Sequence, residues 1–172
     1  MRFRGESMLF ELKSVFLADG GSSEIRYEPD ITDIDIDGIF PFTTPVAVTA
    51  TAVNRASLVT LTLDCEYGYC RPCDRCGVEL RGTERRRFTH RLVQTLVDET
   101  NDDYIETPDF TLELDEVVIS DIILNYPQKF LCSEDCRGLC PVCGKNLNEG
   151  DCGCGRQQVD PRLEILKQLM KE

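Results

Sequence analysis

The sequence predicts an α+β protein, with a mainly antiparallel β domain, a C-terminal cysteine-rich zinc-knuckle segment and short helices. Runs rich in β-branched residues, V-A-V-T-A-T-A-V from Val46 and L-V-T-L-T-L-D-C from Leu58, predict a β-hairpin. Ten cysteines gather in two short clusters, the second of them toward the C-terminal end. We therefore expect a β-rich domain over residues 1–130, carrying a Cys-x-x-Cys insertion, and a zinc-knuckle segment with a C-terminal helix packed on it over residues 131–172.

Three further segments have the alternation of apolar and polar residues that is typical of strands. Residues 8–16 alternate roughly in this way, and residues 31–36 alternate isoleucine with aspartate or threonine. Residues 88–97 form the third segment, after the first cysteine cluster. We find no internal repeat, and the two cysteine clusters do not copy each other.

Two helices are expected near the C-terminal end of the chain. The run V-V-I-S-D-I-I-L-N predicts a short buried helix that is capped by Asp115 and stops before Pro127. Asp160 followed by Pro161 predicts the start of a last helix, since Asp is a common N-cap and Pro fits the first turn. Its apolar stripe comprises Leu163, Leu166 and Met170.

The run C-P-V-C-G, from Cys140 to Gly144, predicts a metal knuckle. Two thiolates separated by two residues can bind one zinc ion. Pro141 presets the turn, Gly144 supplies permissive backbone, and backbone N–H groups can then stabilise the thiolates. A second pair, Cys152 and Cys154, follows after a short loop and would complete a tetrahedron. The expected ligands of this structural zinc site are Cys140, Cys143, Cys152 and Cys154.

A second metal site can be formed from the remaining cysteines. Cys73 and Cys76 make another Cys-x-x-Cys pair. Cys132 and Cys136 are four residues apart, so on a helical turn they would share a face. Pairing the two pairs would join the middle of the chain to its C-terminal part through a structural metal. The chain is thus expected to bind one or two Zn²⁺ ions.

Two alternatives to this pairing stay open. The first cluster, Cys65 to Cys76, has four cysteines and could form a site of its own. Cys132 and Cys136 would then be buried thiols. If the pairing holds, Cys65 and Cys70 are additional, and either could serve as a small buried apolar residue.

Disulfides and an iron–sulfur cluster are the competing interpretations of the cysteines. Disulfides persist in oxidising compartments, but residues 1–7 lack the apolar core of a signal peptide. No apolar run approaches the roughly 18 residues that a membrane span needs. We therefore expect a cytoplasmic protein with reduced thiols. The spacing Cys136-x3-Cys140-x2-Cys143 also occurs in radical enzymes, which need a much larger barrel, although iron can occupy a four-cysteine site.

Charge is unevenly distributed along the chain. The net charge is −12, from 31 acidic and 19 basic residues, which excludes a general nucleic-acid coat. Residues 98–121 contain acidic residues but no Lys or Arg, whereas residues 81–91 are rich in arginine. The arginine-rich run predicts either a local RNA-binding patch or a strand edge with protective charge. The candidate RNA-binding residues are Arg81, Arg85, Arg86, Arg87 and Arg91, with Arg75 and Arg137 beside the metal ligands.

Three segments together resemble the YceD-like proteins, the large ribosomal RNA subunit accumulation proteins. They are Cys73–Cys76, the run from Ile122–Pro127 into Leu131–Asn148, and Cys152–Cys154 with Asp160–Leu163. Their order fits the family over roughly residues 45–172. Cys65 and Cys70 depart from the pattern, as does Gly77, where many members carry Leu.

The resemblance implies a bacterial cytoplasmic, non-enzymatic protein that supports accumulation of large-subunit ribosomal RNA. Its expected partners are that RNA or a ribosomal protein, with no membrane and no small-molecule substrate. The alternative is a zinc-ribbon adaptor that binds a basic ribosomal or transcription protein through its acidic surface.

Two enzyme classes, thiol oxidoreductases and zinc-dependent hydrolases, fit the sequence poorly. A redox Cys-x-x-Cys is expected near a βαβ unit, whereas Cys73 and Cys76 follow a β-hairpin. Catalytic zinc keeps an open position and commonly uses histidine, and the chain has only His90.

Overall fold

The computed structural model describes residues 7–95 and 103–154 and divides into two compact units. The first unit runs through Arg71 and resumes over Glu79–Phe130. Of the described residues, the second comprises Pro72–Val78 and residues 131–154. The Cys-x-x-Cys loop is therefore in contact with the cysteine-rich segment, and the division of the chain into domains at residue 130 stays a prediction.

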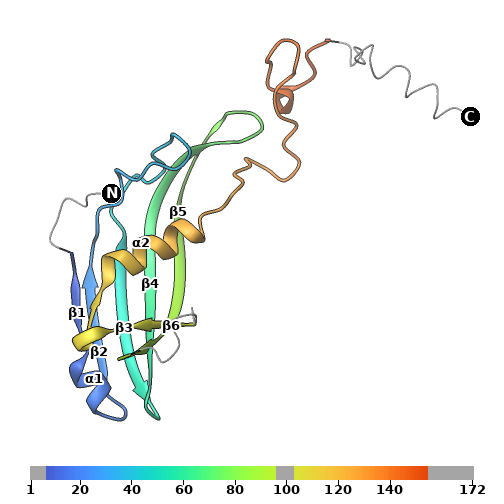
Figure 1. Ribbon diagram of the computed structural model, residues 1–172. Helices are drawn as coiled ribbons and strands as arrows, with labels where there is room; N and C mark the ends of the chain where they lie inside the picture. Colours follow the sequence, from blue (N-terminus) through green and yellow to red (C-terminus); the bar gives the residue numbers. More distant parts are fainter. Residues whose placement is uncertain (1–6, 96–102, 155–172) are drawn as a thin grey trace, which may run out of the picture. The chain divides into compact units, whose positions relative to one another are not determined.

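The first unit contains a mixed sheet whose strand order is β2-β3-β4-β5-β6, and a two-stranded sheet of β1 and β7 (Figure 1). The pairs β2–β3, β3–β4 and β1–β7 are antiparallel, and β6 joins β5 in parallel. The α+β class with a mainly antiparallel sheet, predicted from the sequence, is confirmed. The strands are β1 (Leu9–Glu11), β2 (Ser22–Tyr27), β3 (Ala47–Arg55), β4 (Leu58–Pro72), β5 (Glu79–Val93), β6 (Tyr104–Glu106) and β7 (Thr111–Glu113).

The predicted hairpin is formed by β3 and β4. Val48 pairs with Cys65 and Arg55 with Leu58, so a two-residue turn connects the strands. Both turn residues, Ala56 and Ser57, have positive φ, at 52° and 64°. This is the geometry of a type I′ turn, whose twist matches that of the flanking strands.

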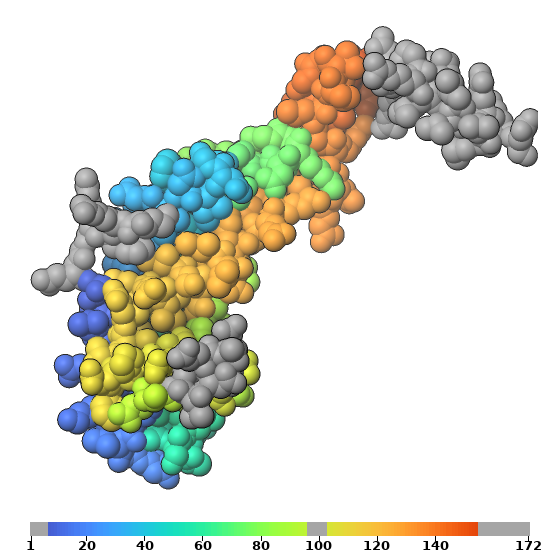
Figure 2. Space-filling view, in the orientation of Figure 1, coloured from blue at the N-terminus to red at the C-terminus, as the bar shows by residue number. Residues whose placement is uncertain are grey.

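The core lies on one face of the sheet. Alternate residues of β3 and β4 are buried there, among them Ala50, Leu61 and Leu63. Helix α2 (Leu114–Leu124) crosses this face and buries Val118 and Ile122 in the same cluster (Figure 1). In the space-filling view, the yellow and light-orange residues of this part of the chain lie across the middle of the visible side of the first unit (Figure 2). The other face of the sheet is left polar.

Helix α1 (Lys13–Leu17) replaces part of the strand expected over residues 8–16; only β1 is extended there. The helix buries Val15 completely. The buried Asn54 side chain donates hydrogen bonds to the carbonyl oxygens of Val15 and Phe16, at 2.9 and 3.3 Å. A tertiary contact therefore satisfies carbonyls at the end of a helix that the local pattern does not reveal.

The strand expected over residues 31–36 is also wrong, because this segment is a turn with one isolated bridge. Asp30 Oδ1 accepts hydrogen bonds from the backbone N–H and the hydroxyl of Thr32. Asp35 Oδ1 accepts one from the N–H of Gly38. Such local side-chain bonds compete with strand pairing.

The α2 helix confirms the expected helix before Pro127 but not its cap. The N-cap residue is Glu113, without a side-chain cap bond, and Asp115 lies within the first turn. There its Oδ2 atom accepts a hydrogen bond from the N–H of Met8. Two short 3-10 helices, η1 (Pro108–Phe110) and η2 (Leu147–Glu149), complete the elements. The helix expected from Asp160 lies outside the described residues.

Among the described residues, no helix is long and apolar enough to cross a membrane.

Candidate metal centres and arginine face

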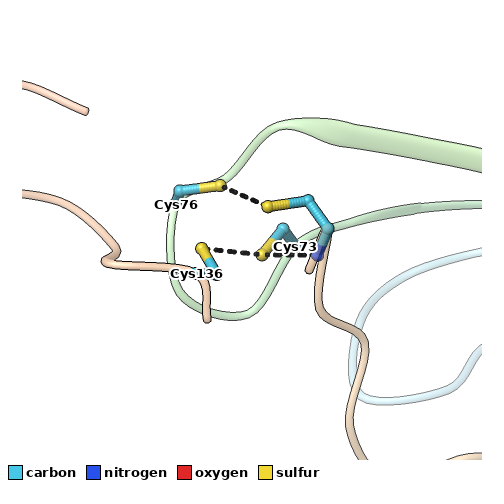
Figure 3. A group of neighbouring side chains, drawn as sticks. Cys73, Cys76 and Cys136 are labelled. Carbon is cyan, nitrogen blue, oxygen red and sulfur yellow. Dashed lines mark hydrogen bonds between the residues drawn. The ribbon is translucent and has the colours of Figure 1, made fainter. Parts of the chain in front are cut away.

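The first candidate metal centre is formed by the β4–β5 connection and the chain after Leu131. Cys73 and Cys76 lie in this connection, where the N–H of Gly77 donates to the carbonyl of Cys73 at 2.9 Å. The Cys73 and Cys136 sulfurs are 3.8 Å apart, and those of Cys76 and Cys132 are 3.6 Å apart (Figure 3). All four sulfur atoms lie within 4.8 Å of one another.

The second centre is formed by Cys140, Cys143, Cys152 and Cys154, whose sulfur atoms also lie within 4.8 Å of one another. Its Cys-x-x-Cys turn has the same backbone hydrogen bonds as the turn of the first centre. The N–H of Gly144 donates to the carbonyl of Cys140, and the N–H of Cys140 to the carbonyl of Lys145. In the first turn, the N–H of Gly77 likewise donates to the carbonyl of Cys73, and the N–H of Cys73 donates to the carbonyl of Val78. Both glycines have φ of +72°.

The two turns are alike although the complete cysteine clusters do not copy each other in sequence. Only the five-residue pattern Cys-x-x-Cys-Gly is shared. The glycine after the second cysteine is the signal that could have revealed it. It supplies the left-handed backbone that closes each turn.

Hydrogen bonds to sulfur favour the thiolate form of the first cysteine in each Cys-x-x-Cys turn. Burial raises the pKa of the Cys73 thiol, but backbone hydrogen bonds from Cys76, Arg75 and Cys132 outweigh it and lower the pKa to about 6. Backbone bonds from Cys143 and Val142 similarly lower the pKa of Cys140 to about 6. Both turns therefore favour the charged form that binds a metal.

Other thiols in the centres retain their protons more strongly. The hydrogen bond with Cys136 raises the pKa of Cys132 to about 12, and the bond with Cys143 raises that of Cys154 to about 12. The pKa of Cys136 is lowered, first by a bond from the Asn148 side chain. Each centre thus pairs thiols that favour the charged form with thiols that hold their protons.

The donor sets suit a tetrahedral metal. A Zn–S distance of about 2.3 Å places the sulfurs of a tetrahedron about 3.8 Å apart. In the first centre, the sulfur distances Cys76–Cys132 and Cys73–Cys136, at 3.6 and 3.8 Å, are close to that spacing. Four thiolates are characteristic of zinc or iron–sulfur sites. Both four-cysteine clusters could therefore hold metal ions, and the assignment of the eight cysteines as zinc ligands stays a prediction.

The two additional cysteines lie apart from these centres. Cys65 is buried in the core, and burial raises the pKa of its thiol to about 12. Cys70 is partly exposed near the end of β4, and desolvation, then its hydrogen bond with Glu79, raises its pKa. All ten cysteines are free thiols in the structure.

Four of the predicted RNA-binding residues share one face of β5. Alternation along the strand places Arg81, Arg85, Arg87 and Arg91 on its exposed side, which we call the arginine face. Arg85 forms an ion pair with Glu66 at 2.9 Å, and Arg87 with Asp64 at 2.6 Å. These two partners come from the neighbouring strand β4. Arg81 pairs within β5, with Glu79 at 2.7 Å.

The other three predicted RNA-binding residues lie elsewhere. Arg86 is on the opposite face of β5, where it pairs with Glu84 at 3.4 Å. In the second unit, Arg75 Nη1 donates to the carbonyl of Cys136 at 2.9 Å. Arg137 Nη2 pairs with Asp151 at 2.6 Å. These contacts give Arg75 and Arg137 a role in holding the metal-centre loops together.

His90 belongs to neither cysteine cluster. Its Nε2 atom is 2.6 Å from Asp121 Oδ2, and both side chains are largely buried. The pair lines a pocket of about 630 Å³ whose wall includes Glu106, Glu116 and Val117. Sequence reasoning did not anticipate this pairing, because residue 121 is on α2 and residue 90 is on β5.

Comparison with known proteins shows the family. The family model described as Large ribosomal RNA subunit accumulation protein YceD matches residues 61–170. This match covers more than half of the chain and includes all ten cysteines. The chain belongs to the YceD family.

The related proteins are distant. Uncharacterized proteins of Mycobacterium tuberculosis (strain H37Rv) and Mycobacterium bovis are each 31% identical over 102 residues, which is 57% of this chain and 49% of theirs. The Arabidopsis thaliana protein named Large ribosomal RNA subunit accumulation protein YCED homolog 1, chloroplastic, is 25% identical over 178 residues, covering 86% of this chain and 54% of its own. The chain thus spans about half the length of these curated relatives. No solved structure matches the chain.

Proposed function

We propose that this protein is a non-enzymatic, zinc-stabilised factor that supports the accumulation of large-subunit ribosomal RNA. The observation that carries this function is the match of residues 61–170 to the YceD family model. The matched residues contain both four-cysteine clusters and the arginine face.

Zinc has a structural role in this function. Over its described residues, which end at Cys154, the second unit has few elements of regular structure, and most of the large apolar side chains there are exposed, including Leu139 and Val142. A segment of this kind buries little apolar surface, so metal binding would supply much of its folding free energy. Eight thiols must stay reduced to bind two ions, which suits a reducing compartment such as the bacterial cytoplasm.

The arginine face is the part of the first unit best suited to contact RNA. Its ion pairs are solvent-exposed, with the Arg85 and Arg87 side chains 79% and 70% accessible. Exposed ion pairs contribute about 0–1 kcal/mol, so phosphates can replace the carboxylates at little cost. A hollow of about 440 Å³ beside these arginines provides room for such a group.

Binding to a large-subunit ribosomal RNA fragment would test this role. Arg85→Gln with Arg87→Gln should weaken binding and reduce the salt dependence, lowering the slope of log K against log salt by about 1.4–1.8. Asp64→Asn with Glu66→Gln should instead strengthen binding, because it frees the same two arginines. Arg26→Gln is the matched control, since this arginine is also exposed and ion-paired, to Glu24, but lies on β2 and does not line the hollow.

The two double variants distinguish RNA contact from an adaptor role. Unchanged RNA binding in both would overturn the assignment of the arginine face. Binding of a basic ribosomal protein that survives the arginine substitutions would favour the acidic-surface adaptor. In cells, a strain depleted of its YceD-family protein and complemented by this chain should regain its ratio of large- to small-subunit RNA. Failure to restore that ratio would contradict the proposed function.

A further inference from the structure

Asn148 connects the two cysteine clusters. It lies between Cys143 and Cys152, within the loop that the second cluster closes. Its side-chain Nδ2 nevertheless donates to Cys136 Sγ of the first cluster at 3.2 Å. Its Oδ1 accepts a hydrogen bond from the backbone N–H of Arg137 at 2.7 Å. One amide side chain therefore contacts a ligand of the first cluster and the residue next to it.

The position of Asn148 is set by the loop of the second cluster. The N–H of Asn148 donates to Asn146 Oδ1 at 3.0 Å, in the cap of η2. The next residue back, Leu147, donates its N–H to the carbonyl of Gly138 at 2.9 Å, and Asn146 forms a bridge with Leu139. The loop that carries the amide is thus held against the three-residue connection between Cys136 and Cys140.

That connection is also bonded to the Cys-x-x-Cys turn of the first cluster. The N–H of Leu139 donates to the carbonyl of Arg75 at 3.2 Å. The Arg75 guanidinium donates in turn to the carbonyls of Glu134 and Cys136, at 3.2 and 2.9 Å. Hydrogen bonds therefore join the loop of the second cluster to Cys136 through Asn148, and the 136–140 connection to the Cys-x-x-Cys turn through Leu139 and Arg75.

We propose that Asn148 is a positioning residue that couples the two metal sites, so that filling one raises the affinity of the other for Zn²⁺. This inference rests on the proposed zinc-stabilised function. A metal in the second site closes the loop between Cys143 and Cys152 and holds Asn148 in place. The ordered amide then donates to Cys136, so the first site loses less conformational entropy when its own ion binds.

Linkage makes this effect reciprocal. A metal in the first site fixes Cys136 and, through the amide, the loop of the second site, so both affinities rise by the same factor. Partners that hydrogen-bond metal ligands typically contribute about 10- to 100-fold in metal affinity. We expect coupling of this size.

A double-mutant cycle on the full chain tests the coupling. Zn²⁺ is titrated into the metal-free, reduced protein against a competing chelator. Occupancy of the first site is read from the protection of Cys73 and Cys76 against alkylation. The variants are Asn148→Ala, Cys152→Ser with Cys154→Ser to remove the second site, and their combination. Glu134→Gln is the control, because it leaves in place the carbonyl that accepts from Arg75.

Asn148→Ala and loss of the second site should each lower the affinity of the first site about 10- to 100-fold, and their combination should add little. Asn148→Asp should not restore affinity, since a carboxylate can accept from Arg137 but cannot donate to the thiolate. Native mass spectrometry of the wild type at limiting zinc should show fewer one-zinc molecules than independent sites would give.

Two results would overturn the coupling while leaving the zinc role intact. One is an Asn148→Ala protein whose first site keeps its wild-type affinity and whose two sites still load cooperatively. The other is an equal loss of affinity from this substitution with and without the second site, which would make Asn148 a local partner only. If the wild type binds no zinc, the zinc-stabilised function fails instead. The two failures are therefore distinguishable.

Discussion

Gly138 and Gly77 provide a matched pair of substitutions at the first metal centre. Both have left-handed backbone, with φ of +73° and +72°. They differ in their surroundings. A Cβ atom at Gly138 would lie 3.0 Å from the carbonyl oxygen of Arg75, whereas one at Gly77 would meet nothing within 4 Å. Alanine at each position therefore separates the cost of the backbone conformation from the cost of the contact.

The magnitudes follow from these geometries. Left-handed backbone costs an alanine about 1–2 kcal/mol at either site. At Gly138 the added methyl must also displace the Arg75 carbonyl, which accepts the N–H of Leu139 at 3.2 Å. Losing that hydrogen bond costs about 1 kcal/mol more. Since metal binding and folding are linked in such a loop, both costs should appear in zinc affinity.

Competition with a chelator at pH 7.5 is the assay. Gly77→Ala should weaken zinc binding at the first site by about 5- to 30-fold, and Gly138→Ala by about fivefold more. Thermal unfolding of the zinc-loaded proteins should rank them in the same order. Equal losses in the two variants, or a larger loss at Gly77, would refute the contact between the 136–140 connection and the Cys-x-x-Cys turn.

The remaining predictions concern the hairpin and the thiols. Replacing Ala56 by Asn and Ser57 by Gly should raise the free energy of unfolding by about 1 kcal/mol, because Asn and Gly favour the positive φ of the turn. Denaturant unfolding measures this change, and an unchanged midpoint would contradict it. Cys65 should resist alkylation in the native protein at pH 8, because burial raises its pKa to about 12. Quantitative labelling followed by mass spectrometry should find Cys65 modified only after unfolding. Fast labelling of the native protein would show instead that the core is open. Zinc uptake at pH 7 should release protons, because Cys132 and Cys154, with pKa values of about 12, are protonated without metal. Titration in weak buffer measures the released protons. No release would show that these thiols are already ionised.

The fold could be predicted where local pattern and tertiary structure agree. Over the paired residues 47–66 of the β3–β4 hairpin, buried residues alternate with more accessible ones, so the period of two is visible in the sequence. The segment over residues 31–36 has the same period but folds as a turn. Its aspartates bond to nearby backbone N–H groups, and three-residue spacing buries Ile31 and Ile34. Side-chain chemistry therefore outweighed the periodic pattern there.

The two cysteine clusters likewise differ in how much their spacing in the sequence reveals about which cysteines lie together. The second group could be assigned from spacing, because its cysteines are close in sequence and the C-P-V-C-G turn is distinctive. The partner pair of Cys73 and Cys76 depends on which distant segment meets the β4–β5 connection, and spacing left other arrangements open. The ion pairs on the arginine face were also not apparent, because they depend on the register of β4 against β5.

The most direct test of the account is the metal content of protein purified without added metal, with thiols counted before and after chelation in denaturant. The account predicts two zinc ions per chain, strong protection of the eight clustered cysteines, and ten free thiols once the metal is removed. One zinc ion, with Cys73 and Cys76 reactive, would contradict the first centre. No metal, with thiols lost to disulfides, would contradict the zinc-stabilised function itself.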